Sequence, residues 1–109
     1  MPKHEFAIMN QPPQPGVAYD EYEPQKYDCL AFDDEIIEAF SEKTADIDTC
    51  WHSVDRPAKG LACYGITLIP PKSMDNFLKV TQEFSELSDL SDLLKKAKEQ
   101  NRFIIHFGI

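Results

Sequence analysis

Residues 50 to 71 read CWHSVDRPAKGLACYGITLIPP, and this stretch decides how the sheet of the fold is arranged. It holds the only tryptophan, one of the three histidines and two of the three cysteines. The DRPAKG sequence at 55–60 is rich in turn residues and lies between two segments with apolar and β-branched side chains. The sequence therefore predicts a hairpin with strands at 49–54 and 61–69, ended by the prolines at 70 and 71.

The register of this hairpin decides which side chains share a face, because a slip of one residue exchanges the two faces. With a loop at 56–59, His52 lies opposite Cys63 and Trp51 lies opposite Tyr64. The more apolar face, which we expect the helices to cover, then holds Trp51, Tyr64, Ile66 and Leu68. The opposite face receives Cys50, His52, Cys63, Gly65 and Thr67.

The rest of the chain predicts further strands and three helices. The additional strands are expected at 5–9, 27–32 and 102–109, where the side chains alternate. The helices are expected to begin at Asp33 or Asp34, at Ser73 and at Ser88. Together these elements predict one α+β domain over residues 1–109, with a mostly antiparallel sheet of about four strands and helices packed on one face.

Residues 10–26 are predicted to form a surface arm. Four prolines lie between positions 10 and 25, and proline lacks a backbone donor and fixes φ. Tyr19 and Tyr22 lie among acidic residues on this arm. Tyrosines in such a position either pin a loop to its own domain or recognise a partner. We expect pinning, and we keep both tyrosines as candidate binding residues.

The last strand has Phe103, Ile105 and Phe107 on one face and His106 on the other. If the three apolar residues join the helix-covered core, His106 and Cys29 lie on the opposite face of the sheet. That face would then carry all three cysteines and two of the three histidines.

Thiols and imidazoles on one face raise the hypothesis of a transition-metal site, with Cys50, His52, Cys63 and His106 as candidate ligands. The spacing argues against it, because the sequence has no CxxC or HxxxH pair. Cysteine is also often buried simply as a small apolar residue. We therefore predict neither a metal nor another cofactor.

An enzymatic alternative uses His52 to activate the thiol of Cys63, with Asp28 or Thr67 as the orienting group. Gly65 beside this pair would leave a gap that either admits a small ligand or permits close packing. The sequence lacks GxGxxG, P-loop, GxSxG, HExxH and EF-hand signatures. We therefore favour a non-enzymatic role and leave enzymatic activity open.

Acidic residues are concentrated in the first half of the chain. The net charge is −8, and residues 1–50 hold three lysines and twelve carboxylates, whereas 51–109 hold eight basic and seven acidic side chains. This distribution argues against nucleic acid and favours a basic protein as partner. The longest uncharged apolar run has nine residues, too few for a membrane span. The odd number of cysteines and the absence of a leader sequence predict free thiols and a cytoplasmic location.

Helical spacing places Asp34, Glu38 and Glu42 on one exposed acidic line. With Tyr19 and Tyr22, these are the predicted binding residues. We favour a protein that acts by binding a basic partner, as an adaptor or an immunity-like inhibitor. The alternative is a small-molecule enzyme or a metal- or ligand-binding protein that uses the Cys and His face. A structural role as a subunit of an oligomer is the third hypothesis.

Three strings, HEFAIMN at 4–10, WHSVDRPAKGLACYGITLIPP at 51–71 and FIIHFGI at 103–109, resemble a family of small bacterial proteins of uncharacterised activity. The resemblance covers nearly the whole chain. It implies a bacterial cytosolic single domain, and it implies no catalytic residue.

Overall fold

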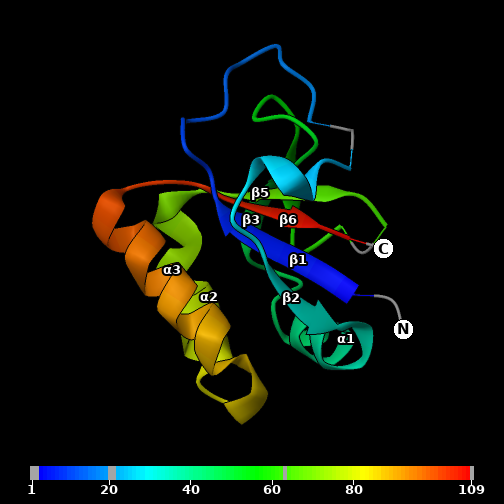
Figure 1. The fold of residues 1–109 in the computed structure, drawn as a ribbon, viewed down its shortest axis with the longest axis vertical. Helices are drawn as coiled ribbons and strands as arrows, with labels where there is room; N and C mark the ends of the chain where they lie inside the picture. Colours follow the sequence, from blue (N-terminus) through cyan, green and yellow to red (C-terminus); the bar gives the residue numbers. More distant parts are fainter. Residues whose placement is uncertain (1–2, 20–21, 63, 109) are drawn as a thin grey trace.

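Six antiparallel strands form one sheet in the part of the chain that the computed structural model describes, residues 3–19, 22–62 and 64–108 (Figure 1). They are β1 (Lys3–Ile8), β2 (Leu30–Asp33), β3 (Asp48–Trp51), β4 (Pro57–Lys59), β5 (Ile66–Ile69) and β6 (Ile104–Phe107). Their order across the sheet is β2-β1-β6-β5-β3-β4. The expected α+β class with an antiparallel sheet is confirmed, but the expected number of about four strands is wrong, in part because the predicted turn itself contributes β4.

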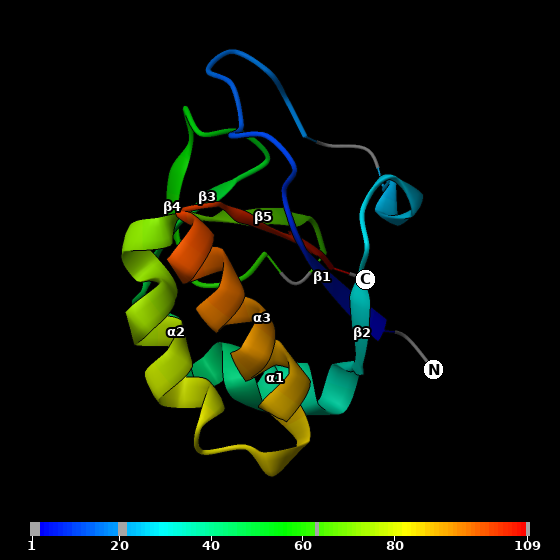
Figure 2. The ribbon, with the colours of Figure 1, turned by 60° about the vertical axis from the view of Figure 1, so that its left-hand side comes forward.

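Three helices cover one face of the sheet (Figure 2). They are α1 (Asp34–Lys43), α2 (Met74–Thr81) and α3 (Ser88–Gln100), and short 3-10 turns at Pro71–Ser73 and Ser85–Leu87 precede the last two. Apolar side chains recur at helical spacing, so each helix turns one stripe toward the sheet. Buried members of the resulting core include Phe6, Ile37, Phe40, Phe77, Leu90 and Ile104. Within the described residues, no helix has the length and apolar character needed to cross a membrane.

The second face of the sheet is also buried. Its apolar cluster consists of Ala7, Met9, Ile66, Leu68, Ile105 and Phe107. The described residues between β1 and β2, 9–19 and 22–29, lie over this face, on the side of the sheet away from the helices (Figure 2). Among the described residues of segment 10–27, the only regular element is a 3-10 turn at Pro24–Lys26. Both faces of the central strands are therefore covered, and every residue of β5 and β6 is buried.

The strands predicted at 49–54 and 61–69 do pair antiparallel, as β3 and β5, but the predicted register is wrong and β4 intervenes between them in the chain. β3 pairs with β4 on one side and with β5 on the other, antiparallel in both cases. The chain reverses directly after β3, where Trp51 donates its N–H to the carbonyl of Arg56 over 3.1 Å and His52 takes a left-handed φ of 66°. The return strand is consequently β4, and the following loop carries the chain across to β5.

This pairing changes which side chains share a face. Trp51 lies opposite Thr67 on the helix-covered side, whereas Leu68 lies opposite Cys50 on the other side. Tyr64 is 86% exposed and joins neither face. The expected apolar face of Trp51, Tyr64, Ile66 and Leu68 is therefore not formed, although the indole itself is on the expected side.

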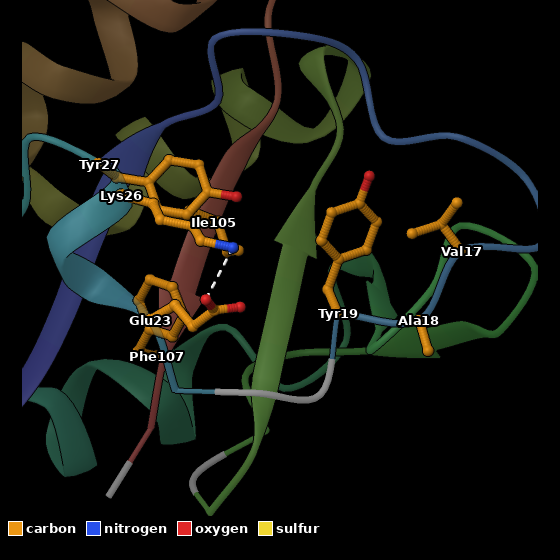
Figure 3. A pocket seen from close by; sticks show the side chains of 8 residues that line it. All are labelled: Val17, Ala18, Tyr19, Glu23, Lys26, Tyr27, Ile105 and Phe107. Carbon is orange, nitrogen blue, oxygen red and sulfur yellow. Dashed lines mark ion pairs between the residues drawn. The ribbon is translucent and has the colours of Figure 1, made fainter.

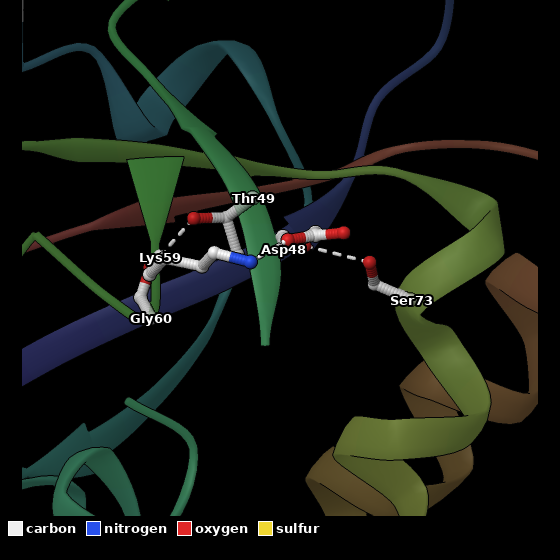
Figure 4. A network of polar contacts seen from close by, with 5 residues as sticks. All are labelled: Asp48, Thr49, Lys59, Gly60 and Ser73. Atoms are coloured by element: carbon white, nitrogen blue, oxygen red, sulfur yellow. Dashed lines mark hydrogen bonds and ion pairs between the residues drawn. The ribbon is translucent and has the colours of Figure 1, made fainter. Parts of the chain in front are cut away.

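A polar network fixes β3 between β4 and the start of α2 (Figure 4). The Thr49 hydroxyl donates to the carbonyl of Gly60 over 2.7 Å, and the Ser73 hydroxyl donates to the carbonyl of Asp48 over 2.6 Å. Lys59 and Asp48 form an exposed ion pair across β3 and β4. Since the two hydroxyl oxygens are largely buried and bonded to main-chain carbonyls, they hold the register of this margin of the sheet.

Gly60 is expected to tolerate no side chain. Its φ is +66°, and a Cβ atom there would lie 3.0 Å from the Cα atom of Ala45. Gly60→Ala should therefore lower the free energy of unfolding, measured by urea denaturation, by roughly 1–2 kcal/mol for the left-handed conformation plus the cost of moving a backbone. Gly16→Ala is the control, because Gly16 has φ +80° with nothing within 4 Å. Equal losses in the two variants would show that the contact with Ala45 is unimportant.

Candidate functional site

The predicted Cys and His cluster is not assembled as expected. His106 lies on the helix-covered face beside Ile104, whereas Cys29 and Cys50 pack against the cluster on the second face. The reason is that the helices cover the even-numbered residues of β6, not the odd-numbered ones. Cys63 lies outside the described residues. Across the described ranges, no group of three or more His, Cys, Asp or Glu side chains is arranged to hold a metal ion.

The two described thiols are poor nucleophiles. Burial, with smaller contributions from the nearby carboxylates of Glu5 and Asp28, raises the pKa of the Cys29 thiol to about 11. Burial also raises the pKa of the Cys50 thiol, against a smaller opposing effect of Lys72. Because the thiolate is the reactive form, neither side chain is prepared for covalent catalysis at neutral pH.

His52 is held in place by backbone hydrogen bonds and by packing against Gly65. Its N–H donates to the carbonyl of Ile66 over 3.0 Å, and its own carbonyl accepts from the N–H of Tyr19 over 2.5 Å. The imidazole fills the space beside Gly65, where a Cβ atom would lie 2.7 Å from His52 Nε2. The gap expected at Gly65 is therefore taken by close packing. Nδ1 of His52 is buried and has no hydrogen-bond partner among the described residues.

A chain of hydrogen bonds runs through the interior between α1 and the sheet. Asp34 Oδ1 lies 2.7 Å from His4 Nε2, and His4 Nδ1 lies 2.8 Å from His106 Nε2. His106 Nδ1 lies 3.1 Å from Thr67 Oγ1, which accepts from the N–H of Ala62 over 2.7 Å. The two imidazole planes are within 8° of parallel. The chain joins the first turn of α1 to β1, β6 and β5, which are far apart in sequence.

With neutral imidazoles and Asp34 as a carboxylate, which only accepts, one arrangement of protons satisfies every member of this chain of hydrogen bonds. The Asp34 carboxylate accepts from Nε2–H of His4, so Nδ1 of His4 must accept from Nε2–H of His106. Nδ1 of His106 must then accept from the hydroxyl of Thr67. Burial, with a smaller contribution from the neighbouring His4, lowers the pKa of His106 to about 3. His106 is therefore neutral in the folded protein at physiological pH.

The order carboxylate, imidazole, imidazole, hydroxyl resembles a catalytic triad extended by one ring. Its hydroxyl, however, belongs to Thr67, which is fully buried, and both His4 and His106 are at most 1% exposed. A substrate in solvent cannot reach the Thr67 oxygen in this arrangement. This chain of hydrogen bonds therefore holds α1 against the sheet, and its burial keeps it out of reach of a substrate.

A pocket of about 340 Å³ lies between the second face and segment 10–27 (Figure 3). Ile105 and Phe107 line it from the sheet, and Tyr19 and Tyr27 line it from the covering segment. An ion pair of 2.7 Å between Lys26 and Glu23 lies at its side (Figure 3). The pocket is small, and the opposite charges of Lys26 and Glu23 cancel each other. This ion pair therefore presents no net charge to a ligand.

The two tyrosines predicted for binding contact their own domain. Tyr22 packs edge-on against Phe107 with ring centroids 5.6 Å apart, and its hydroxyl donates to Glu5. The N–H of Tyr19 donates to His52, and its hydroxyl accepts from the N–H of Gln14 over 3.3 Å. These contacts correspond to the expected pinning; Tyr22 is nevertheless 61% exposed.

An acidic cleft lies beside α1, at the margin of the sheet formed by β2. Its volume is about 500 Å³, and its lining residues are Lys3, Ala31, Phe32, Asp33, Glu35, Ile36 and Glu86. Phe32 and Ile36 are half-buried and supply apolar surface, whereas the three carboxylates are exposed. We call this site the acidic cleft. It combines apolar area with an excess of negative charge.

The predicted acidic line on α1 is displaced by one residue at its start. Asp34 turns inward to His4 and is only 34% exposed, so the exposed carboxylates of the helix are Glu35, Glu38 and Glu42. These three recur at helical spacing on the solvent side. The line extends from the acidic cleft along the whole of α1.

Comparisons of the chain with protein-family models, with curated proteins and with solved structures returned no match. The resemblance to a family of small bacterial proteins therefore stays a prediction.

Proposed function

We propose that the protein binds a basic segment of another protein at the acidic cleft and along the carboxylates of α1. The observation that supports this proposal most is the composition of the cleft, where half-buried Phe32 and Ile36 lie among three carboxylates and one lysine. These charged residues are Asp33, Glu35, Glu86 and Lys3. Lysine and arginine side chains suit such a site, because their aliphatic stems cover apolar surface while their charges reach carboxylates. The cytosol is the compartment we propose, since Cys29 and Cys50 are free thiols.

The charge distribution of the whole chain supports the same partner. A net charge of −8, concentrated in residues 1–50, attracts a cationic segment over distances comparable to the Debye length. Within α1, the described lysine near the end of the helix, Lys43, pairs with Glu83 at 2.8 Å and lies at the end away from the cleft. The first turns of the helix therefore keep their negative potential.

The enzymatic alternative receives less support. Its predicted nucleophile, Cys63, lies outside the described residues, and burial raises the pKa of both described thiols, Cys29 and Cys50. The ligand-binding form of this alternative also requires His106 on the same face as Cys50, and His106 is on the other face. Protein binding therefore explains more of the described surface than catalysis does.

Neutralising the α1 carboxylates should weaken binding to a basic probe. The probe is a synthetic peptide of alternating lysine and valine, and the variant combines Glu35→Gln, Glu38→Gln and Glu42→Gln. We expect Kd, measured by calorimetry at about 50 mM salt, to rise about tenfold or more, and binding by the wild type to weaken at about 300 mM salt.

The matched control combines Asp89→Asn, Asp92→Asn and Glu99→Gln on α3, which are also exposed and remove the same charge. This control should change Kd far less than the α1 variant does. Absence of saturable binding by the wild type at low salt, or equal weakening by both triple variants, would overturn the proposal.

A further inference from the structure

The backbone groups of β2 that point away from the sheet can be identified from the pairing of β1. Met9 donates its N–H to the carbonyl of Phe103 over 2.9 Å, so the odd-numbered residues of β1 direct their backbone groups toward β6. The even-numbered residues consequently direct theirs toward β2, where they lie opposite Leu30 and Phe32. Ala31, between these two, must direct both its N–H and its carbonyl outward from the sheet.

The outer edge of β2 is open over this residue. Ala31 is exposed, and it lines the acidic cleft. β2 lies at the margin of the sheet beside α1, and none of the described strands lies outside it (Figure 2). An exposed edge with unpaired donors and acceptors is a template on which another extended segment can pair.

The opposite edge of the sheet is protected. Trp51 donates to the carbonyl of Arg56, so on β4 the residues Pro57 and Lys59 face outward. Proline has no N–H to offer, and Lys59 adds a charge on the same short strand. The protein therefore has one blocked edge and one open edge, and the open edge is the one that borders the acidic cleft.

We propose that β2 accepts an extended cationic segment of a partner protein as an additional strand of the sheet. This inference rests on the proposed function and specifies how the partner binds. Side chains of an added strand alternate between the two faces. Those on the helix side reach the acidic cleft, where Phe32 and Ile36 take apolar contacts and Glu35 and Glu86 take the charges.

The size of the edge limits the length of the segment. β2 has four residues, which corresponds to about 13 Å of strand. Few main-chain hydrogen bonds are available over that length, so the cationic side chains must supply much of the affinity. The partner segment is therefore short, extended and basic, with apolar residues between its charges.

The decisive variant is Ala31→Pro, because it removes the outward N–H and keeps the carboxylates. Proline is tolerated on an edge strand where its missing N–H faces solvent, so the fold should persist. With the alternating lysine and valine peptide as probe, Kd should rise roughly two- to tenfold, the effect of one hydrogen bond. Ala31→Val keeps the N–H and should bind as the wild type does. An alternating glutamate and valine peptide should not bind.

A measurement on the unmodified protein keeps the inference testable if Ala31→Pro fails to fold. In isotopically labelled protein, the lysine and valine peptide should slow hydrogen exchange of the Ala31 amide and shift its resonance, whereas the amide of Lys59 on the blocked edge should not change. If the peptide binds and the α1 triple variant weakens it, but Ala31→Pro binds normally and the Ala31 amide is unaffected, strand addition is wrong and the proposed function stands. If the peptide does not bind at all, both fail.

Discussion

Acid should destabilise the wild-type protein more steeply than a His106→Gln variant at pH values below about 6.5. Glutamine can donate from its amide nitrogen to Nδ1 of His4 and accept from the hydroxyl of Thr67, so it replaces both hydrogen bonds of His106 without a titrating ring. The variant should therefore keep most of its stability at pH 7 and lose the part of the acid sensitivity that His106 causes.

The direction of this effect follows from where His106 takes up its proton. Burial, assisted by His4, lowers the pKa of His106 from 6.5 to about 3 in the folded protein. Between these values the unfolded chain carries a proton on this ring that the folded chain lacks. The stability that depends on neutral His106 is therefore fully present above about pH 6.5 and is lost as the pH falls toward 3, by up to about tenfold in the folding equilibrium constant per pH unit.

Urea denaturation followed by Trp51 fluorescence, at about pH 7, 5.5 and 4.5, tests this prediction. A second variant accompanies it. His106→Leu leaves Nδ1 of His4 and the Thr67 hydroxyl without their partner and should cost roughly 2–4 kcal/mol at pH 7. If the free energy of unfolding fell equally with decreasing pH in the wild type and in His106→Gln, His106 would not be the cause of this acid sensitivity.

The sequence predicts much of the local structure and less of its arrangement. Helical spacing indicates the helix after Asp33 and the helix at Ser88, and both form. Alternation also gives the correct parity within the last strand, with Ile105 and His106 on opposite faces. It could not decide which parity faces the helices, because all four residues of β6 are buried and the second face is as well covered as the first.

The buried histidine pair was not predicted because its members are distant in sequence. His4 and His106 are separated by 102 positions, and Asp34 has an equally good local explanation as a residue of a helix start. One signal was available, since His4 has the same parity as Phe6 and so belongs to the core side of its strand. The open edge at Ala31 could likewise not be predicted, because it depends on which strand lies at the margin of the sheet. The excess of carboxylates around it, by contrast, could be predicted from composition and helical spacing.

Phe107→Ala should give the largest loss of stability among the variants of the second face. Phe107 is 1% exposed, and the rings of Tyr22 and Tyr27 lie 5.6 and 5.9 Å from its own. Removing the ring leaves a cavity in the sheet face and takes away the surface on which segment 10–27 packs (Figure 3). We expect a loss of about 3–5 kcal/mol in the free energy of unfolding, measured by urea denaturation.

The same variant separates packing of the segment from packing of the strand. If Phe107 holds segment 10–27 in place, trypsin should cleave after Lys26 faster in Phe107→Ala than in the wild type under conditions where the sheet remains folded. Phe103→Ala is the matched control, because Phe103 is half-buried and packs against the same cluster without a described ring contact to Tyr22 or Tyr27. It should cost less stability and leave the cleavage rate near that of the wild type. Equal cleavage in all three proteins would mean that the hydrogen bonds from Gly16 to Asp55 and from Tyr19 to His52 hold the segment on their own, and that the aromatic contacts add stability only to the sheet.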